Sequence, residues 1–205
     1  MSNHPFTLVD VMRHGEPVGG TRYRGHIDDP LSDKGWQQMR DAVANHKPWN
    51  AIVSSPMLRC VEFAKELAKR HKLPMDIDER IKEISWGKWE GSSAEQLNQH
   101  DPLTVTRALR NPTMHRPADA ENVTDFQRRV IDAWQDITNR YRNQHILLIA
   151  HAGVIRAIIT FMLNAPAENM FRIHVPSASI TRIQIDLHDD EPFTKLLFHG
   201  GKLDP

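Results

Sequence analysis

Short, nearly continuous apolar runs recur along the chain, and each of the first three stops at a polar or charged group. Runs of this kind are typical of strands that are covered on both faces, as in a parallel sheet. They occupy residues 7–12, 51–53 and 145–150. Two further segments with β character, residues 179–187 and 195–199, lie near the C-terminus.

Apolar side chains at helical spacing fill the intervals between these runs. One helix is predicted after Ser32, its N-cap, and another at Ser55-Pro56, a pair typical of an N-cap followed by the first helical position. A long amphipathic helix is predicted to open near Asn122, and residues 154–163 are apolar on nearly all sides, which predicts a buried helix. Strands that alternate with helices indicate an α/β fold with a mostly parallel central sheet.

The stretch from about residue 79 to residue 121 has a different character. It contains Trp86, Trp89 and several glycines and prolines, and its periodicity is weak. We expect it to form a lid that is inserted over one end of the sheet. Because no internal repeat or linker interrupts the chain, residues 1–205 are predicted to form a single domain.

Charge and composition narrow the function classes. The 26 basic residues balance the 26 acidic ones, so no net charge steers the chain toward nucleic acid or an anionic membrane, and neither is expected as a partner. The single cysteine, Cys60, excludes an intramolecular disulfide. The first ten residues lack the features of a secretion signal, and His151 and Arg156 break the most apolar stretch. We therefore expect a soluble, cytoplasmic protein.

The candidate chemistry lies where the apolar runs end. These ends carry Arg13-His14, then Ser54-Ser55 with Arg59 close behind, and finally His151. Because ligands of open α/β sheets bind at the carboxyl ends of the strands, we expect these side chains to converge. His151 and Ala152 also lead into a helix, whose free N–H groups favour an anion. Two guanidinium groups, two imidazoles and two helix starts predict a site for a phosphoryl group.

His14 is the candidate nucleophile of this site. The neighbouring arginines disfavour protonation of its ring, and a neutral imidazole can attack phosphorus. The chain has twelve histidines, so pairings by chance are common, and the repeated position at strand ends is what favours a catalytic role. A metal site built on His14, His26 and His151 is rejected, because the two arginines oppose a divalent cation and no metal-ligand spacing is present. No cofactor is expected.

Five segments, in order, resemble the motifs of the histidine phosphatase superfamily, in its phosphoglycerate mutase-like branch. They are residues 8–16, 22–35, 54–59, 83–91 and 151–156. The resemblance covers nearly the whole chain. It implies a three-layer α/β/α sandwich with a mostly parallel central sheet and a lid insertion, and a phosphomonoesterase that works through a phosphohistidine without a metal.

The resemblance also assigns roles to particular residues. It implies that His14 attacks phosphorus and that Arg13, Arg59, His151 and Ala152 bind the phosphoryl group. Glu83 would protonate the leaving oxygen and then deprotonate the attacking water, which requires a carboxyl in a partly closed site such as one beside Trp86. On residue type alone, a solvated lid carboxylate is the favoured interpretation of Glu83, and only the matching motif singles it out. The neighbouring candidates are Glu79, Glu90 and Glu95.

The particular branch is suggested by two segments. The stretch after Glu16 and the lid are both short, which favours hydrolysis over mutase activity, because a mutase must shield its phosphohistidine from water. Residues 16–39 resemble the α-ribazole-5′-phosphate phosphatases of cobalamin synthesis. The alternatives are a phosphatase of broad specificity or one for sugar phosphates or nucleotides, then a phosphoglycerate mutase, and then a non-catalytic phospholigand-binding protein. In each case the expected partner is a small phosphorylated metabolite.

The rim of the site is the least determined part. Trp86 and Trp89 would either stack on a planar leaving group or pack within the lid. Arg24 and Gly25 are candidate substrate contacts, although exposed loop residues of these types are often only solvated. The sequence is compatible with a homodimer through an edge strand and does not require one.

Overall fold

The computed structural model describes residues 6–188 and 191–203, and a six-stranded sheet lies at its centre. The strand order is β3-β2-β4-β1-β5-β6. The first four strands of this order are parallel, whereas β5 and β6 are antiparallel to their neighbours. The strands are β1 (Thr7–Arg13), β2 (Ala51–Ser54), β3 (Met75–Ile77), β4 (His145–Ala150), β5 (Ile180–His188) and β6 (Glu191–Gly201).

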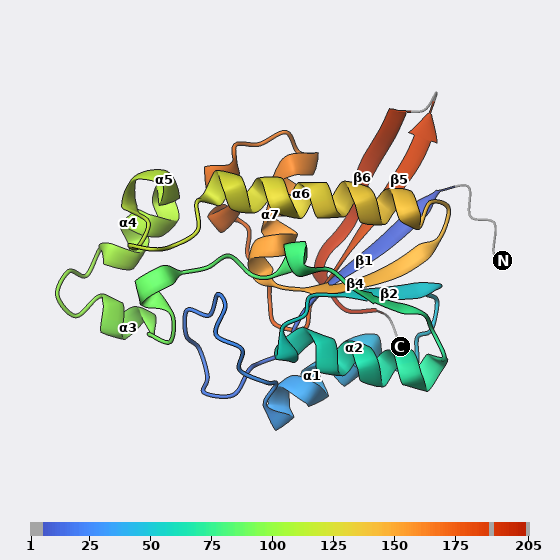
Figure 1. The fold of residues 1–205 in the computed structure, drawn as a ribbon, viewed down its shortest axis with the longest axis horizontal. Helices are drawn as coiled ribbons and strands as arrows, with labels where there is room; N and C mark the ends of the chain where they lie inside the picture. Colours follow the sequence, from blue (N-terminus) through green and yellow to red (C-terminus); the bar gives the residue numbers. More distant parts are fainter. Residues whose placement is uncertain (1–5, 189–190, 204–205) are drawn as a thin grey trace.

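Helices cover both faces of the sheet (Figure 1). α1 (Asp33–Val43) and α2 (Leu58–His71) pack on one face, and α6 (Val123–Arg140) and α7 (Ala152–Met162) pack on the other. Successive side chains of β4 alternate between the two cores: Ile146 and Leu148 join the α6–α7 side, and Leu147 and Ile149 join the α1–α2 side. The apolar runs are continuous because both faces are buried, and the predicted three-layer α/β/α sandwich is confirmed.

The helix starts match the sequence signals in two cases and differ in two. Ser32 caps α1 by accepting a hydrogen bond from the Gly35 N–H, and Asn122 caps α6. α2 begins at Leu58 with Met57 as its N-cap, so the prediction that Ser55 caps this helix is wrong. The Ser55 hydroxyl is instead bonded to a histidine ring at the site. α7 begins at Ala152, two residues earlier than the apolar stretch indicated.

Short helices make up the segment between β3 and α6. They are η1 (Glu79–Ile81), η2 (Gly87–Trp89), α3 (Ala94–Leu97), α4 (Thr104–Arg110) and α5 (Pro112–His115). α3, α4 and α5 lie beyond one end of the sheet (Figure 1). A further short helix, η3 (Ala167–Arg172), follows α7. No helix in the described parts of the chain combines the length and apolarity needed to cross a membrane.

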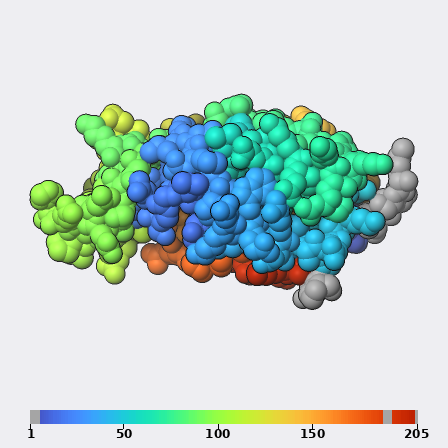
Figure 2. Space-filling model, turned by 90° about the horizontal axis from the view of Figure 1, so that it is seen from below, coloured from blue at the N-terminus to red at the C-terminus, as the bar shows by residue number. Residues whose placement is uncertain are grey.

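The loop after β1 meets this helical segment at the end of the molecule where the parallel strands terminate. Figure 2 shows the loop, in blue, beside the segment in green. The main chains of the two are hydrogen-bonded, from Tyr23 N–H to Ser92 O and from Gly91 N–H to Tyr23 O, both at 2.9 Å. The loop and the segment therefore form one continuous wall above the strand ends.

Candidate active site

His14 directly follows β1 and lines a cavity of about 370 Å³. Its Nδ1 atom lies 2.7 Å from the main-chain oxygen of Gly15. Because a carbonyl oxygen can only accept a hydrogen bond, the proton of the neutral ring is on Nδ1 and the lone pair is on Nε2. The hydrogen bond thus selects the tautomer in which Nε2 is free to attack an electrophile.

Burial and positive charge hold the His14 ring neutral. Burial lowers its pKa well below the usual 6.5, and the positive charges of Arg59 and then Arg13 lower it further. The side chain is only 6% exposed. At neutral pH this imidazole is therefore unprotonated, as a nucleophile requires.

The two arginines predicted to bind phosphate have different surroundings. Arg13 lines the cavity, donates from Nη1 to the Val175 carbonyl at 2.6 Å, and has a buried Nε with no partner among the described residues. Arg59 is fully buried and does not line the cavity. Its terminal nitrogens donate to the carbonyls of Ile27 and Gly25 at 2.8 and 2.9 Å. Arg13 is placed for direct contact, whereas Arg59 acts on the site through its field, and its contact with a phosphoryl oxygen stays a prediction.

His151 is the N-cap residue of α7 and lies behind His14. The two rings meet edge to face, with centroids 5.2 Å apart. His151 is fully buried, and burial first, then Arg59 and His14, lower its pKa well below 6.5. Its Nε2 is 2.8 Å from Ser55 Oγ, and Cys60 Sγ lies 3.7 Å from the same nitrogen. Ser55 therefore orients the ring, a role that its position beside a proline did not reveal.

Glu83 is a buried cavity-wall residue rather than a solvated lid carboxylate. It is 8% exposed, and its Oε2 accepts a hydrogen bond from the Gly153 N–H at 3.1 Å. This N–H is one of the free donors of the first turn of α7. The neighbouring candidates do not line the cavity: Glu79 is paired with Lys82, Glu90 accepts loop hydrogen bonds, and Glu95 is exposed.

Gly153 is needed at this helix start because Glu83 packs directly against it. A methyl group at this position would collide with Oε1 of Glu83 and lie 3.1 Å from its Cδ. Ala152, the residue before it, lines the cavity. The helix start predicted to hold an anion is therefore at the cavity, with the Glu83 carboxylate on one of its N–H groups.

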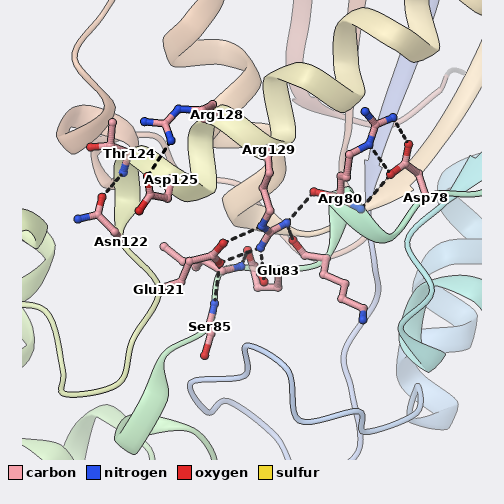
Figure 3. Close-up of polar contacts among 12 residues, drawn as sticks. Asp78, Arg80, Glu83, Ser85, Glu121, Asn122, Thr124, Asp125, Arg128 and Arg129 are labelled. Atoms are coloured by element: carbon pink, nitrogen blue, oxygen red, sulfur yellow. Dashed lines mark hydrogen bonds and ion pairs between the residues drawn. The ribbon is translucent and has the colours of Figure 1, made fainter.

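Arg129 of α6 fixes the main chain that carries Glu83 (Figure 3). Its Nη1 donates to the carbonyls of Arg80 and Lys82 at 2.6 and 2.9 Å, and its Nη2 donates to that of Glu83 at 3.1 Å. The same guanidinium holds both carboxylate oxygens of Glu121, at 2.7 and 2.8 Å. Sequence reasoning missed this clamp, because nothing in an amphipathic helix pattern distinguishes one arginine from the next.

The four residues predicted at the rim divide into two that line the cavity and two that do not. Trp86 lines it and packs against Tyr23, with centroids 4.8 Å apart, and against Phe171 at 5.5 Å. Trp89 does not line it and is stacked on Trp86, with ring planes 5° apart. Arg24 lines it, but its three guanidinium nitrogens are bonded within its own loop. Gly25 lies behind the wall, where its carbonyl accepts from Arg59.

Sequence reasoning assigned no role to Arg156, which lies in the cavity wall together with Arg22. Arg156 follows His151 by five residues, on the same helix face as Gly153, so its spacing was the available signal.

Within residues 6–188 and 191–203, no group of three or more His, Cys, Asp and Glu side chains is arranged to hold a metal ion. Independence from metals stays a prediction.

A neutral histidine, an arginine and a buried carboxylate share one cavity near the ends of the parallel strands, as a phosphoric monoester hydrolase requires. The chain belongs to the histidine phosphatase superfamily (branch 1), whose family model matches residues 9–196.

Two curated relatives and one solved structure illustrate the relationship. Phosphoserine phosphatase 1 of Hydrogenobacter thermophilus is 26% identical, over 86% of this chain and 85% of its own length. The adenosylcobalamin/alpha-ribazole phosphatase of Salmonella typhimurium is 25% identical, over 85% of this chain and 89% of its own. The structure of Bacillus stearothermophilus YhfR matches with a TM-score of 0.81 and 25% identity, over 95% and 97% of the two chains. Three mycobacterial relatives are longer, and the match covers 49% of each.

Proposed function

We propose that the protein hydrolyses small phosphomonoesters through a phosphohistidine at Nε2 of His14. The observation that carries this proposal is the hydrogen bond from Nδ1 to the Gly15 carbonyl, which leaves Nε2 with its lone pair in a cavity. The second support is the lowered pKa of His14, which keeps that lone pair available at neutral pH.

The reaction has two steps that share one carboxyl group. In the first, Nε2 of His14 forms a bond to phosphorus while the P–O bond of the ester breaks, and Glu83 gives its proton to the leaving oxygen. In the second, water attacks the phosphorus, Glu83 takes a proton from that water, and the N–P bond breaks. Inorganic phosphate leaves, and both residues return to their starting protonation states. Arg13 and the start of α7 stabilise the charge on the phosphoryl oxygens.

The test is phosphate release from p-nitrophenyl phosphate in the presence of a chelator. We expect full activity of the wild-type protein and none in His14→Ala. Because p-nitrophenolate leaves without a proton, Glu83→Gln should keep the first step and slow the second, so that acid-labile phosphoenzyme accumulates. Loss of activity in chelator, or an active His14→Ala variant, would contradict the covalent histidine mechanism. Transfer of phosphate between positions of phosphoglycerate without release would identify a mutase instead.

For the substrate, we propose α-ribazole-5′-phosphate, an intermediate of cobalamin synthesis, as the first to test. This proposal is supported by the resemblance of residues 16–39 to α-ribazole-5′-phosphate phosphatases and by the name of the Salmonella relative. A third support is the indole of Trp86 in the cavity wall, which suits a planar leaving group. The measurement is kcat/KM for α-ribazole-5′-phosphate against a panel of sugar phosphates and nucleotides. Comparable values across the panel would favour a phosphatase of broad specificity. Unchanged discrimination in Trp86→Ala would refute stacking.

A second substrate class, phosphomonoesters that carry a carboxylate, is favoured by one observation. Arg156 adds a further cation to the cavity wall, beyond those assigned to the phosphoryl group. The Hydrogenobacter relative is named as a phosphatase of phosphoserine, which is such a compound.

The cytoplasmic location and a homodimer through an edge strand remain proposals. Light scattering, which measures the mass of the particle in solution, tests the homodimer.

A further inference from the structure

Arg156 lies in the cavity wall one helical turn beyond the start of α7. It is four positions after Ala152, which places its Cα about 6 Å further along the helix axis. It shares the cavity with Arg13, His14 and Glu83. Arg156 therefore faces the space beside the expected phosphoryl group, where the leaving part of a substrate would lie.

The guanidinium of Arg156 is held in place on one side and free on the other. Its Nε donates to the Ile173 carbonyl at 2.8 Å, and its Cζ lies 5.8 Å from the centroid of the Phe171 ring. Within the described parts of the chain, Nη1 and Nη2 have no hydrogen-bond partner and the side chain forms no ion pair. Arg24, in the same wall, is the contrast, because all three of its guanidinium nitrogens are occupied.

The cavity wall carries more arginines than the one placed for direct phosphoryl contact, since Arg22 and Arg156 line it beside Arg13. Arg13 and Arg156 are close enough for repulsion to help lower the pKa of Arg13, after burial. The Glu83 carboxylate acts on both guanidiniums, yet it forms no ion pair with either in the described chain. A second anionic group on the substrate would find the unpartnered edge of the Arg156 guanidinium, and a carboxylate matches its two parallel donors.

We propose that Arg156 binds a carboxylate on the leaving group and thereby makes carboxylated phosphomonoesters the preferred substrate class. This inference rests on the proposed phosphatase function. It favours the second of the two substrate classes above, because α-ribazole-5′-phosphate has no carboxylate. Phe171 and the Ile173 carbonyl hold the guanidinium plane before substrate arrives, so that little ordering is needed on binding.

The experiment compares phosphoserine with phosphoethanolamine, two substrates that differ only in the carboxylate. We expect the wild-type protein to prefer phosphoserine in kcat/KM by about tenfold to a hundredfold, the range of a charge-assisted bidentate contact. Arg156→Gln should remove most of this preference while changing phosphoethanolamine turnover by less than about threefold. Arg156→Lys should restore part of it, because the charge remains without the fork. The control is Arg172→Gln, an exposed arginine outside the cavity wall.

The internal control for folding is phosphoethanolamine turnover, since it requires an intact site without the carboxylate contact. An equal loss on both substrates in Arg156→Gln would place Arg156 at the phosphoryl group or in the fold and overturn the proposal. The proposal would also be overturned if the wild-type protein did not prefer phosphoserine to phosphoethanolamine. If neither compound is hydrolysed, turnover of p-nitrophenyl phosphate shows separately whether the phosphatase proposal stands. Calorimetric binding of the two compounds to His14→Ala, with and without Arg156→Gln, then decides: only a preference for phosphoserine that Arg156→Gln removes supports the carboxylate subsite.

Discussion

Arg129 donates a hydrogen bond to the main-chain oxygen of Glu83 at 3.1 Å, although the two residues are 46 positions apart in the sequence. The bond belongs to a clamp in which one guanidinium holds three carbonyls of the 80–83 segment, those of residues 80, 82 and 83, and the carboxylate of Glu121. A long, otherwise regular helix thus fixes the position of Glu83, the residue proposed to exchange a proton with the substrate.

This clamp predicts a positioning role for Arg129. Arg129→Lys keeps the charge but cannot hold three carbonyls and a carboxylate together, so Glu83 should shift. Because small misplacements of a catalytic group are costly, we expect kcat to fall about tenfold to a hundredfold with little change in KM. The matched control is Arg128→Lys, since Arg128 is exposed and, among the described residues, pairs with Asp125 alone. If p-nitrophenyl phosphate kinetics of the two variants are alike, Arg129 is merely structural.

Gly153→Ala should separate activity from stability. The added methyl group would meet the Glu83 carboxylate, so the carboxylate must move away from the helix start. We expect kcat to fall by more than about tenfold. Inside a helix, alanine is favoured over glycine by about 1 kcal/mol, so the change in the free energy of unfolding should be small or favourable if Glu83 gives way. Urea unfolding and kcat are the measurements, and unchanged kcat would mean that the Glu83 position is unimportant.

The two buried histidines predict a loss of stability in mild acid. His14 and His151 have pKa values well below 6.5 in the folded protein, whereas they titrate near 6.5 when unfolded. Below pH 6.5 the two histidines therefore bind protons in the unfolded chain but stay unprotonated in the folded chain. The free energy of unfolding should fall as the pH drops, by up to about 1.4 kcal/mol per pH unit for each histidine.

The measurement is urea unfolding between pH 7.5 and pH 5, for the wild type and for the double variant His14→Gln/His151→Gln. The double variant should depend less on pH over this interval. Identical slopes would show that these rings protonate in the folded state. The same low pKa implies that protonation of His14 does not limit kcat/KM near pH 6.5, and a rate profile checks this point.

The architecture was accessible from the sequence because its signal is local. A strand buried on both faces must be apolar throughout, as residues 145–150 are, and a parallel sheet brings the residues after such strands to one edge. Arg13 and His14 lie at the cavity with His151 directly behind them for this reason, whereas the place of Glu83 was implied only by the family resemblance.

The parts that could not be predicted depend on contacts between distant residues. The three residues of β3 are too few to show a pattern and pair only at the sheet edge. The Ser55 hydroxyl orients His151, 96 positions away, and the local Ser-Pro signal pointed to a helix cap instead. In the sequence, Arg156 is indistinguishable from other helix residues. Only the structure places it in the cavity wall, with its terminal nitrogens unpartnered among the described residues.

The surroundings of Asp10 likewise depend on distant residues and could not be predicted from the sequence. It lies within an apolar strand and is fully buried, where it accepts hydrogen bonds from Trp49, His145 and Arg182 at 2.7–3.0 Å. Burial raises its pKa, but the hydrogen bonds from His145 and Arg182 outweigh this and hold the pKa below its usual value. The carboxylate is therefore charged and fully partnered at neutral pH.

Removing this charge leaves the donors of Arg182 and His145 facing a neutral amide. Asp10→Asn should therefore lower the free energy of unfolding by about 3–5 kcal/mol, the cost of breaking a buried ion pair from one side. The exposed Asp132 gives the matched control, and Asp132→Asn should change stability by less than about 0.5 kcal/mol. Because Asp10 lies away from the strand end, kcat of the folded variant should equal that of the wild type. A loss of kcat without a loss of stability would mean that this network acts on His14 through β1 rather than on the fold.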